Sequence, residues 1–242
     1  MTADTAPDDT APEQPTEFRQ TPYAPPPGAT ELLLVRHGAS EAIRPGERFP
    51  IVDGHGDPAL APEGHEQAEA VARRLAVEKI DAVYTSGLRR TVQTAAPLAA
   101  RLGLEPVVSP GLREVRLGEW EGGLFRQKVH ENGPVARRMW AEERWDVIPG
   151  AETNEALAAR VTASLDEIVT AHAGGRVAVF VHGGVIAAAL AQATSSRPFA
   201  FIGADNGSVS HLLVVEGSWV LRRFNDTAHL DPELTARSAP PA

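Results

Sequence analysis

The chain has 242 residues, of which 43% are hydrophobic, and a formal net charge of −9. This length and this nonpolar content suit one globular domain with tails. Residues 1–30 hold five acids and one Arg, which contributes −4, and residues 231–242 hold two acids and one Arg, which contributes −1. The −4 that remains on the body argues against a general nucleic-acid surface, because a phosphate backbone attracts a basic face.

Cysteine is absent from the whole sequence. Disulfides, thiolate metal ligands and a cysteine nucleophile are therefore excluded. The N-terminal segment has no apolar stretch of the kind that a secretory signal needs, and the longest apolar stretch, residues 177–193, is interrupted by His182-Gly183-Gly184. These features predict a soluble cytoplasmic protein without a membrane partner, and a homodimer is the default expectation for its assembly.

Residues 1–30 are rich in Pro, Thr, Ala and acidic side chains and end in Pro25-Pro26-Pro27-Gly28. Such a segment cannot bury enough nonpolar surface to offset the entropy of ordering it, so it is predicted to be a disordered tail. Residues 231–242 have a similar composition and the same prediction. The folded domain is expected to span residues 31–230.

The first predicted strand, residues 31–35, runs directly into Arg36-His37-Gly38. A buried strand with this ending delivers a cation and an imidazole to the carboxyl edge of a sheet, where open α/β folds bind ligands. Arg forms bidentate hydrogen bonds with phosphate oxygens, and a neutral His nitrogen is a nucleophile. Gly allows another backbone segment to come close. The tripeptide alone is a weak signal, and its position at a strand end gives it weight.

A predicted helix over residues 62–77 precedes a second strand at residues 82–85. The next helix is expected over residues 88–102 and begins with Arg89 and Arg90. Arginine in a first turn is unfavourable for the helix dipole. An anion bound at this end is one explanation, a solvated surface pair is the other, and the residues alone leave the choice open.

A short strand over residues 106–108 leads to a segment at residues 112–122 that contains Glu114, Glu119 and Glu121. A carboxylic acid among cations can protonate a leaving group. Spacing alone does not select one of the three glutamates, and the usual role of such residues is in a solvated loop.

Two further helices are predicted over residues 134–143 and 154–171. A strand over residues 177–181 then ends in His182-Gly183-Gly184, and a helix follows over residues 185–193. This repeats the arrangement of strand, His, Gly and helix at the first site. A second His at a strand end therefore strengthens the interpretation of both histidines as functional residues.

A hairpin of residues 210–215 and 219–224 ends the predicted domain. The alternation of strands and helices predicts an α/β fold, a three-layer α/β/α sandwich with a mainly parallel sheet. The histidines and acids show no metal-ligand spacing, so no metal site is expected. The other six histidines are interpreted as structural or surface residues: His55, His65, His130, His172, His211 and His229.

Taken together, these segments resemble the histidine phosphatase superfamily, also called the phosphoglycerate mutase-like family. Five motifs match in order across residues 31 to about 215. The matching residues are Arg36-His37-Gly38; Asp57-Pro58 with Leu60, Gly64 and Gln67-Ala68; Ser86 with Leu88, Arg90 and Thr94-Ala95; Leu112, Glu114, Gly118 and Trp120-Glu121-Gly122; and His182-Gly183-Gly184. Five ordered motifs are a strong signal, and they imply the phosphoglycerate mutase-like form of the sandwich.

The resemblance implies five catalytic residues: Arg36, His37, Arg90, Glu114 and His182. His37 would be the nucleophile that forms a phosphohistidine, and Glu114 would donate the proton to the leaving group. The two arginines and His182 would bind the phosphoryl group without a metal or another cofactor. Nearby arginines are expected to lower the pKa of His37 and so keep it able to attack.

Ser40 and Gly183 complete the candidates for substrate binding, although a capping role is the more usual one for Ser40. The chain departs from the family in the segment Ser40-Glu41-Ala42-Ile43, where members often have an Asn. The loop over residues 44–56 is also longer than usual, which leaves the substrate open. Five arginines are candidates for contacting a second anionic group or are simply solvated: Arg44, Arg48, Arg126, Arg137 and Arg138.

The favoured function is a metal-independent phosphomonoester hydrolase of the histidine acid phosphatase-like kind that acts on a small phosphorylated metabolite. A cofactor-dependent phosphoglycerate-type mutase is the first alternative, and a phospho-ligand-binding protein without catalysis is the second. The segment over residues 113–122, REVRLGEWEG, resembles the phosphatase branch more than the mutase branch.

Overall fold

The computed structural model describes residues 19–230. The predicted tail at residues 231–242 and residues 1–18 of the predicted N-terminal tail lie outside this described part. Residues 19–28 are exposed and form neither helix nor strand, whereas Ala29 and Thr30 are buried where the first strand begins. The guanidinium carbon of Arg222 lies 3.7 Å from the centre of the Tyr23 ring, so this segment contacts strand β8 (Ser218–Asp226) of the domain through Tyr23.

Within residues 19–230, six strands form one central sheet in the order β5-β4-β6-β1-β7-β8. The strands are β1 (Thr30–Arg36), β4 (Ala82–Thr85), β5 (Val107–Val108), β6 (Arg176–Val181), β7 (Val209–Val215) and β8 (Ser218–Asp226). The first four are parallel to one another, and the β7–β8 hairpin runs antiparallel beside β1. The predicted strands are therefore confirmed.

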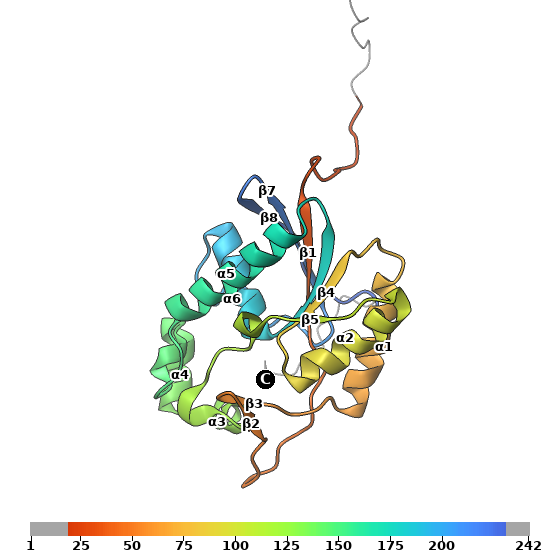
Figure 1. Cartoon of the computed structure of the whole chain (residues 1–242). Coiled ribbons are helices and arrows are strands. Elements are labelled where there is room, and N and C mark those ends of the chain that lie inside the picture. The colour runs from red at the N-terminus through yellow and green to blue at the C-terminus, as the bar shows by residue number, and fades with distance from the viewer. Residues whose placement is uncertain (1–18, 231–242) are drawn as a thin grey trace, which may run out of the picture.

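Helices cover both faces of the sheet, as Figure 1 shows. The main helices are α1 (Pro62–Leu75), α2 (Arg89–Leu102), α5 (Asn154–Ala171) and α6 (Gly183–Thr194). Side chains alternate along β1: Leu33 and Val35 join the nonpolar cluster with α1 and α2, whereas Leu32 and Leu34 join the cluster with α5 and α6. A strand buried on both faces is typical of a parallel sheet between two helix layers, and the predicted three-layer sandwich is confirmed.

A small layer lies beyond the carboxyl edge of the sheet (Figure 1). It contains the hairpin of β2 (Ile51–Val52) and β3 (His55–Gly56) and the helices α3 (Leu124–Glu131) and α4 (Pro134–Glu142). Single turns of 3-10 helix occur at Pro110–Leu112, Gly118–Trp120 and Trp145–Val147. Of the elements in this layer, only α4 was predicted from the sequence.

Local features of the chain explain why the sequence analysis did not predict the β2–β3 hairpin and helix α3. Asp53 and Gly54 both have positive φ, 48° and 83°, as the two central residues of a tight hairpin turn require. An Asp-Gly pair is a hairpin signal, and the sequence analysis, which assigned residues 44–56 to a loop, did not use it. Helix α3 has no buried residue, so the nonpolar periodicity that marks a helix is weak there.

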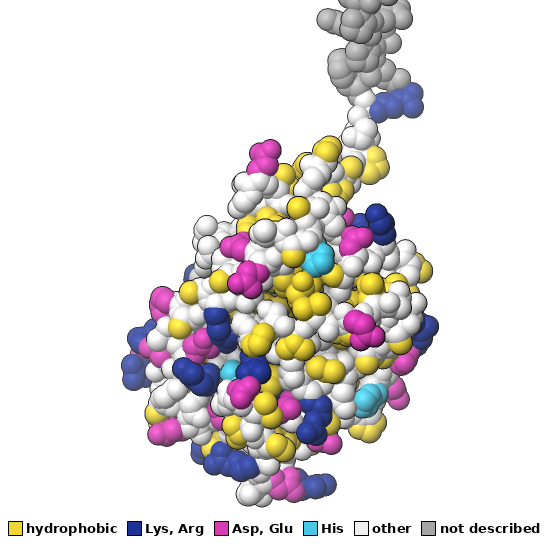
Figure 2. Space-filling view, viewed as in Figure 1, with side chains coloured by type: hydrophobic (Ala, Val, Ile, Leu, Met, Phe, Trp, Pro, Cys, Tyr) yellow, Lys and Arg dark blue, Asp and Glu magenta, His cyan; other side chains and the backbone are white. Residues whose placement is uncertain are grey.

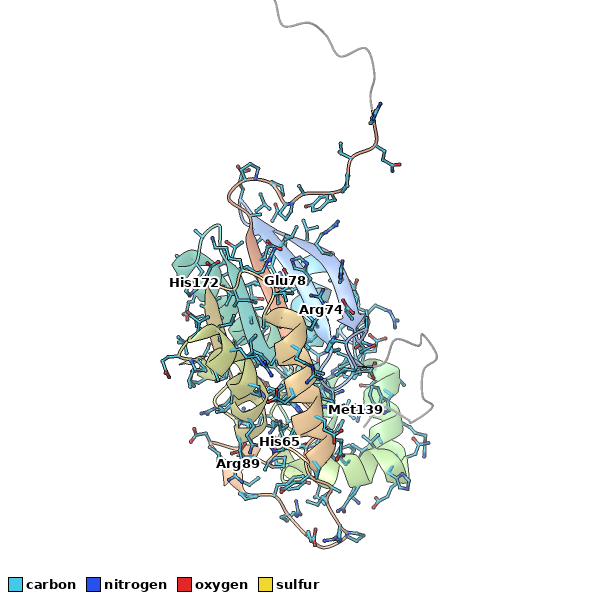
Figure 3. All side chains as sticks on the ribbon, turned by 90° about the vertical axis from the view of Figure 1, so that its right-hand side faces the viewer. His65, Arg74, Glu78, Arg89, Met139 and His172 are labelled. Carbon is cyan, nitrogen blue, oxygen red and sulfur yellow. The ribbon has the colours of Figure 1, made fainter. Side chains whose placement is uncertain are left out.

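Ion pairs join the segments at the amino-terminal edge of the sheet. Arg176 at the start of β6 contacts Glu78 at 2.7 Å and Glu31 at 2.9 Å. Glu78 also pairs with Arg74 at 3.0 Å, near the end of α1, where Figure 3 labels both residues. A strand of this length spans about 20 Å, so these pairs stabilise the fold far from the carboxyl edge. Among the residues described, no helix is both long and apolar enough to cross a membrane.

Candidate active site

The two histidines that follow strands lie side by side. Strands β1 and β6 are parallel neighbours in a register that pairs Arg36 with Val181, so the next residues, His37 and His182, leave the sheet together. Their ring centres are 5.2 Å apart, and the rings meet edge to face at 62°. Both side chains are buried, with 6% and 0% exposed. The sheet therefore brings two imidazoles to one point on its carboxyl edge.

A backbone hydrogen bond defines which nitrogen of His37 can react. The Nδ1 atom lies 2.7 Å from the carbonyl oxygen of Gly38, so Nδ1 carries the proton and donates it. The Nε2 atom then holds the lone pair, which is the electron pair that a nucleophile needs. Among the contacts of residues 19–230, Nε2 has no hydrogen-bond partner.

The loop that carries His37 is held by side chains from both helices on one face of the sheet. Thr94 of α2 accepts a hydrogen bond from the amide of Gly38 at 3.0 Å, and Gln67 of α1 accepts one from the amide of Ala39 at 2.8 Å. Asn206 donates its side-chain amide to the carbonyl of His37 at 2.8 Å. The nucleophile is therefore fixed by partners on three separate segments.

Close backbone contact explains two of the motif glycines. A Cβ on Gly38 would overlap the carbonyl oxygen of Gly64, and a Cβ on Gly64 would overlap that of Ala39. Glycine at both positions lets the loop lie directly against the start of α1. The spacing of these glycines in the sequence is thus a consequence of one packing contact.

Two arginines lie beside the histidines, of which Arg90 is buried and Arg36 is half-buried. Arg36 donates from Nη1 to the carbonyl of Ala204, and Arg90 donates from Nη1 to that of Gly56 at 2.9 Å. Burial lowers the pKa of Arg36, and it lowers the pKa of Arg90 to about 10, against the attraction of Glu114. Both guanidinium groups stay charged near neutral pH and supply positive charge in a site with little water.

Arg90, and not its neighbour Arg89, is the arginine that enters the site. Arg90 is 7% exposed, whereas Arg89 is exposed at the molecular surface, where Figure 3 labels it at the start of α2. The amide of Arg89 donates to Asp57 at 2.7 Å, so the Asp of the second motif caps this helix end. The match of Arg90 to the family pattern agrees with this burial.

Burial holds the pKa of both histidines well below their usual range. For His37 the next causes are the charges of Arg90 and Arg36, and for His182 they are Arg90 and His37. The expected direction for His37 is therefore found, although burial is a larger cause than the arginines. Both imidazoles are neutral at pH 7, which leaves the Nε2 lone pair of His37 available.

His182 is oriented by a chain of hydroxyl groups. Its Nε2 lies 2.9 Å from the hydroxyl of Ser86, which lies 3.0 Å from that of Thr91, and Thr91 donates to the carbonyl of Leu88 at 2.8 Å. The single hydroxyl proton of Thr91 is donated to the carbonyl of Leu88. Ser86 therefore donates its own hydroxyl proton to Thr91 and accepts a hydrogen bond from Nε2 of His182. The Nε2–H group is thus the donor of this ring, and the Nδ1 atom, which is buried and has no partner among the residues described, holds the lone pair.

The structure separates the three glutamates. Glu114 accepts hydrogen bonds from the amides of Val115 at 2.9 Å and Gly184 at 3.3 Å, at the start of α6 beside the histidines. Glu119 is exposed. Glu121 accepts from the amide of Gly56 at 2.8 Å, and thus supports the carbonyl group that holds Arg90. Of the three glutamates, Glu114 is the one that lies beside the histidines and whose charge acts most on Arg36 and Arg90.

Glycine at the start of α6 makes room for Glu114. A Cβ on Gly184 would lie 2.5 Å from Oε1 of Glu114, and a Cβ on Gly183 would lie 3.5 Å from Nε of Arg36. Gly183 therefore lies at the wall of the site, beside a guanidinium nitrogen that is buried and unpartnered within residues 19–230.

Three further residues also lie near the site: Ser40 and Arg126, which were candidates from the sequence, and His55, which was interpreted as a structural or surface residue. The Ser40 hydroxyl accepts a hydrogen bond from Nη2 of Arg126 at 2.6 Å. Arg126 lowers the pKa of His37 and of Arg90 by its charge, and His55 does the same for His182. Neither residue belongs to a motif at a strand end, because both come from the layer beyond the sheet, where the sequence pattern was weak.

No group of three or more His, Asp or Glu side chains in residues 19–230 is arranged to hold a metal ion. The five catalytic candidates nevertheless form one cluster of a free imidazole nitrogen, two cations, a carboxyl group and a second imidazole. Such a cluster suits the transfer of a phosphoryl group, which requires an aligned nucleophile and positive charge around the transferred oxygens.

Comparison with known proteins agrees with this geometry. Phosphoglycerate mutase-like protein 4 of Arabidopsis thaliana is 37% identical over 207 residues, which cover 83% of this chain and 87% of that protein. Phosphoserine phosphatase 1 of Hydrogenobacter thermophilus is 34% identical over 204 residues, which cover 83% and 94%. The solved structure of a mycobacterial glucosyl-3-phosphoglycerate phosphatase has 30% identity and a TM-score of 0.69, over 82% of this chain and 100% of that one.

The family model described as histidine phosphatase superfamily (branch 1) matches residues 32–227, which include every motif that the site uses. The sequence motifs, the mutase-like fold, these relatives and the family model all agree. The chain belongs to the histidine phosphatase superfamily.

Proposed function

We propose that this protein is a metal-independent phosphomonoester hydrolase that acts through a phosphohistidine on His37. The observation that carries the proposal is the neutral, buried imidazole of His37, whose Nδ1 is bound to Gly38 and whose Nε2 is free between two charged arginines. An acid phosphatase-like phosphomonoesterase with a small phosphorylated metabolite as substrate is the activity that this arrangement supports best.

In the first step, the Nε2 lone pair of His37 attacks phosphorus while the bond from phosphorus to the ester oxygen breaks. Glu114 in its acid form transfers its proton to that oxygen, and the alcohol leaves. Arg36 and Arg90 stabilise the negative charge on the three equatorial oxygens as it redistributes in the transition state. Both guanidinium groups are held by backbone carbonyls, so little reorganisation is needed.

In the second step, water attacks the phosphohistidine in line with the bond from phosphorus to nitrogen. The Glu114 carboxylate accepts a proton from the water, the bond to Nε2 breaks, and inorganic phosphate leaves. His37 and Glu114 return to their starting states, so the cycle balances without a metal or a cofactor.

The substrate is proposed to be a small molecule rather than a macromolecule. Relatives include two proteins named phosphoserine phosphatases and one solved phosphatase of glucosyl-3-phosphoglycerate, and these names support a small phosphomonoester. On the face in Figure 2, basic side chains are interspersed with acidic ones, which favours no nucleic-acid partner. A cytoplasmic location without a membrane partner, and a homodimer, complete the proposal; sedimentation of the purified chain tests the dimer.

A phosphoglycerate-type mutase is the competing function, and relatives with mutase names are its support. A mutase must return the phosphoryl group from histidine to another substrate hydroxyl before water reaches it. Rapid interconversion of phosphoglycerates without phosphate release would favour the mutase. If no donor phosphorylates His37, the third candidate, a phospho-ligand-binding protein, becomes the better account.

The test is phosphate release from a broad panel of phosphomonoesters in the presence of EDTA. Wild type and His37→Ala are compared under the same conditions. The proposal predicts release by wild type that is lost in the variant. Equal release by both proteins would contradict it, because the nucleophile would then lie elsewhere.

A further inference from the structure

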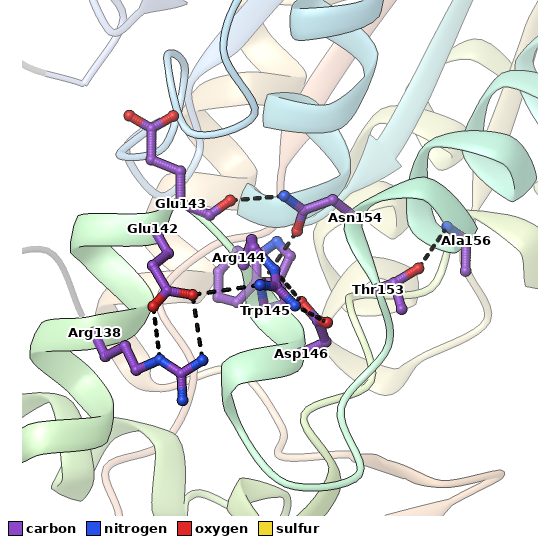
Figure 4. A network of polar contacts seen from close by, with 9 residues as sticks. All are labelled: Arg138, Glu142, Glu143, Arg144, Trp145, Asp146, Thr153, Asn154 and Ala156. Atoms are coloured by element: carbon purple, nitrogen blue, oxygen red, sulfur yellow. Dashed lines mark hydrogen bonds and ion pairs between the residues drawn. The ribbon is translucent and has the colours of Figure 1, made fainter.

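Arg126 stands out among the five arginines that the sequence offered for a second anionic group. Arg44 pairs with Glu47 and is exposed, and Arg138 pairs with Glu142 at 2.7 Å on the surface, as Figure 4 shows. Arg126 lies at the start of α3, half-buried, with its guanidinium turned toward the loop after His37.

The guanidinium of Arg126 is held in place by neutral groups only. Its Nη2 donates to the Ser40 hydroxyl at 2.6 Å, and its Nη1 donates to the carbonyl of Glu41 at 2.8 Å. Its carbon lies 5.5 Å from the centre of the Phe49 ring, a cation–π contact. Within residues 19–230, no carboxylate forms an ion pair with this side chain. A fixed, half-buried cation without a counter-charge favours an anion beside it.

The position of Arg126 relates it to the reacting groups. It lies close enough to His37 and Arg90 to lower the pKa of each, and burial and then Arg36 lower its own. Arg36 is attracted by Glu114 and Asp205, whereas Arg126 faces the repulsion of Arg36. Two arginines already match the charge of one phosphoryl group, so the third calls for a further negative charge on the substrate.

We propose that Arg126 is a specificity residue that binds a carboxylate on the leaving-group side of the phosphomonoester. The free N–H groups of Arg126 and the hydroxyl of Ser40, which keeps its own proton to donate, form the binding site. The substrate class is therefore a phosphomonoester whose alcohol carries a carboxylate a few bonds from the ester oxygen. This inference rests on the proposed phosphoryl site between Arg36, His37 and Arg90.

A matched pair of phosphonates tests the proposal without hydrolysis. 4-Phosphonobutanoate and propylphosphonate differ only by a terminal carboxylate, and neither has an ester bond to break. Calorimetric titration of wild type is expected to show about 10- to 100-fold tighter binding of the carboxylate compound, the range of a charge-assisted pair. Arg126→Gln is expected to bring this ratio to about 1, with a much smaller loss of affinity for propylphosphonate than for the carboxylate compound.

Arg48→Gln is the matched control, because Arg48 is an exposed arginine of the same layer that donates to the carbonyl of Glu121. It is expected to keep the wild-type ratio, and Arg126→Lys is expected to keep part of it. An equal loss of both ligands in Arg126→Gln would overturn the inference and make Arg126 a third ligand of the phosphoryl group. If wild type binds neither phosphonate, the phosphoryl site and the inference fail together; if both bind equally, only the inference fails.

Discussion

At the scale of single residues, hydrogen bonds to backbone atoms determine which atoms of the site can react. Gly38 fixes the proton of His37 on Nδ1, and the amides of Val115 and Gly184 fix the carboxyl group of Glu114. These contacts are formed by the main chain, so the composition of the site alone does not reveal them. The motif pattern selected Glu114 from three glutamates, and hydrogen bonding supplies the physical reason.

The proton-donor role of Glu114 leads to a prediction about leaving groups. In Glu114→Gln, kcat/KM for an alkyl phosphate is expected to fall by about 10²- to 10⁴-fold, because an alkoxide cannot leave without a proton. Hydrolysis of p-nitrophenyl phosphate is expected to fall much less, because nitrophenolate leaves unprotonated. Steady-state kinetics on both substrates measure the difference, with Glu119→Gln as an exposed control. Equal losses on both substrates would show that Glu114 positions the site and transfers no proton.

Close backbone packing between elements sets the position of the nucleophile. The loop after β1 lies against the start of α1 because neither Gly38 nor Gly64 has a Cβ. In Gly64→Ala the new methyl group would overlap a carbonyl oxygen, and a backbone atom has no rotamer with which to move aside. The free energy of unfolding is expected to fall by about 1–3 kcal/mol, together with activity.

Gly133→Ala is the control for this prediction. Gly133 precedes α4, has φ of −67°, and has no neighbouring atom within 4 Å of the position that a Cβ would occupy. Its substitution is expected to cost less than about 1 kcal/mol, the range of a cap change. Denaturant unfolding of the three proteins compares them, and a Gly64→Ala protein as stable as Gly133→Ala would refute the packing argument.

The sequence predicted elements well where side chains are buried on one or both faces. Strands β1 and β6 are continuous nonpolar runs, and both were found with their following His residues. Helix α3 buries no residue, and β2 and β3 have two residues each, so neither gives a periodic signal. Arg126 and His55 lie on these elements, which explains why the sequence did not separate Arg126 from four other arginines and placed His55 among the structural or surface residues.

At the scale of the whole molecule, the parallel sheet brings together motifs that lie far apart in the chain. His37 and His182 are far apart in the sequence, and adjacent strands in register make them neighbours. The alternation of strands and helices predicted the sandwich, because a parallel sheet needs a crossover between its strands. The strand order itself follows from three-dimensional packing and was not predicted.

The two buried histidines also give the fold a pH dependence. Their pKa values lie well below the ordinary value of about 6.5 in the folded protein and near that value in the unfolded chain. Below about pH 6.5 the unfolded chain therefore binds protons that the folded protein does not, and stability falls as the pH falls. Each histidine adds up to about 1.4 kcal/mol of unfolding free energy per pH unit.

Urea unfolding between about pH 7 and pH 5.5 measures this slope. His37→Gln and His182→Gln are each expected to reduce it, since the variant loses one group that protonates on unfolding. His211 and His229, whose pKa values are also lowered by burial, account for part of the slope that remains. An unchanged slope in both variants would mean that these imidazoles are protonated in the folded protein.

The central claim is that His37 carries the phosphoryl group, and trapping that intermediate tests it most directly. The enzyme is mixed with a substrate from the phosphate-release panel, quenched in alkali, where phosphohistidine survives, and digested for mass spectrometry. The account predicts one phosphoryl group on the peptide that contains His37 in wild type and none in His37→Ala. Phosphate release by wild type without any phosphorylated His37 at any quench time, or release that persists in His37→Ala, would contradict it.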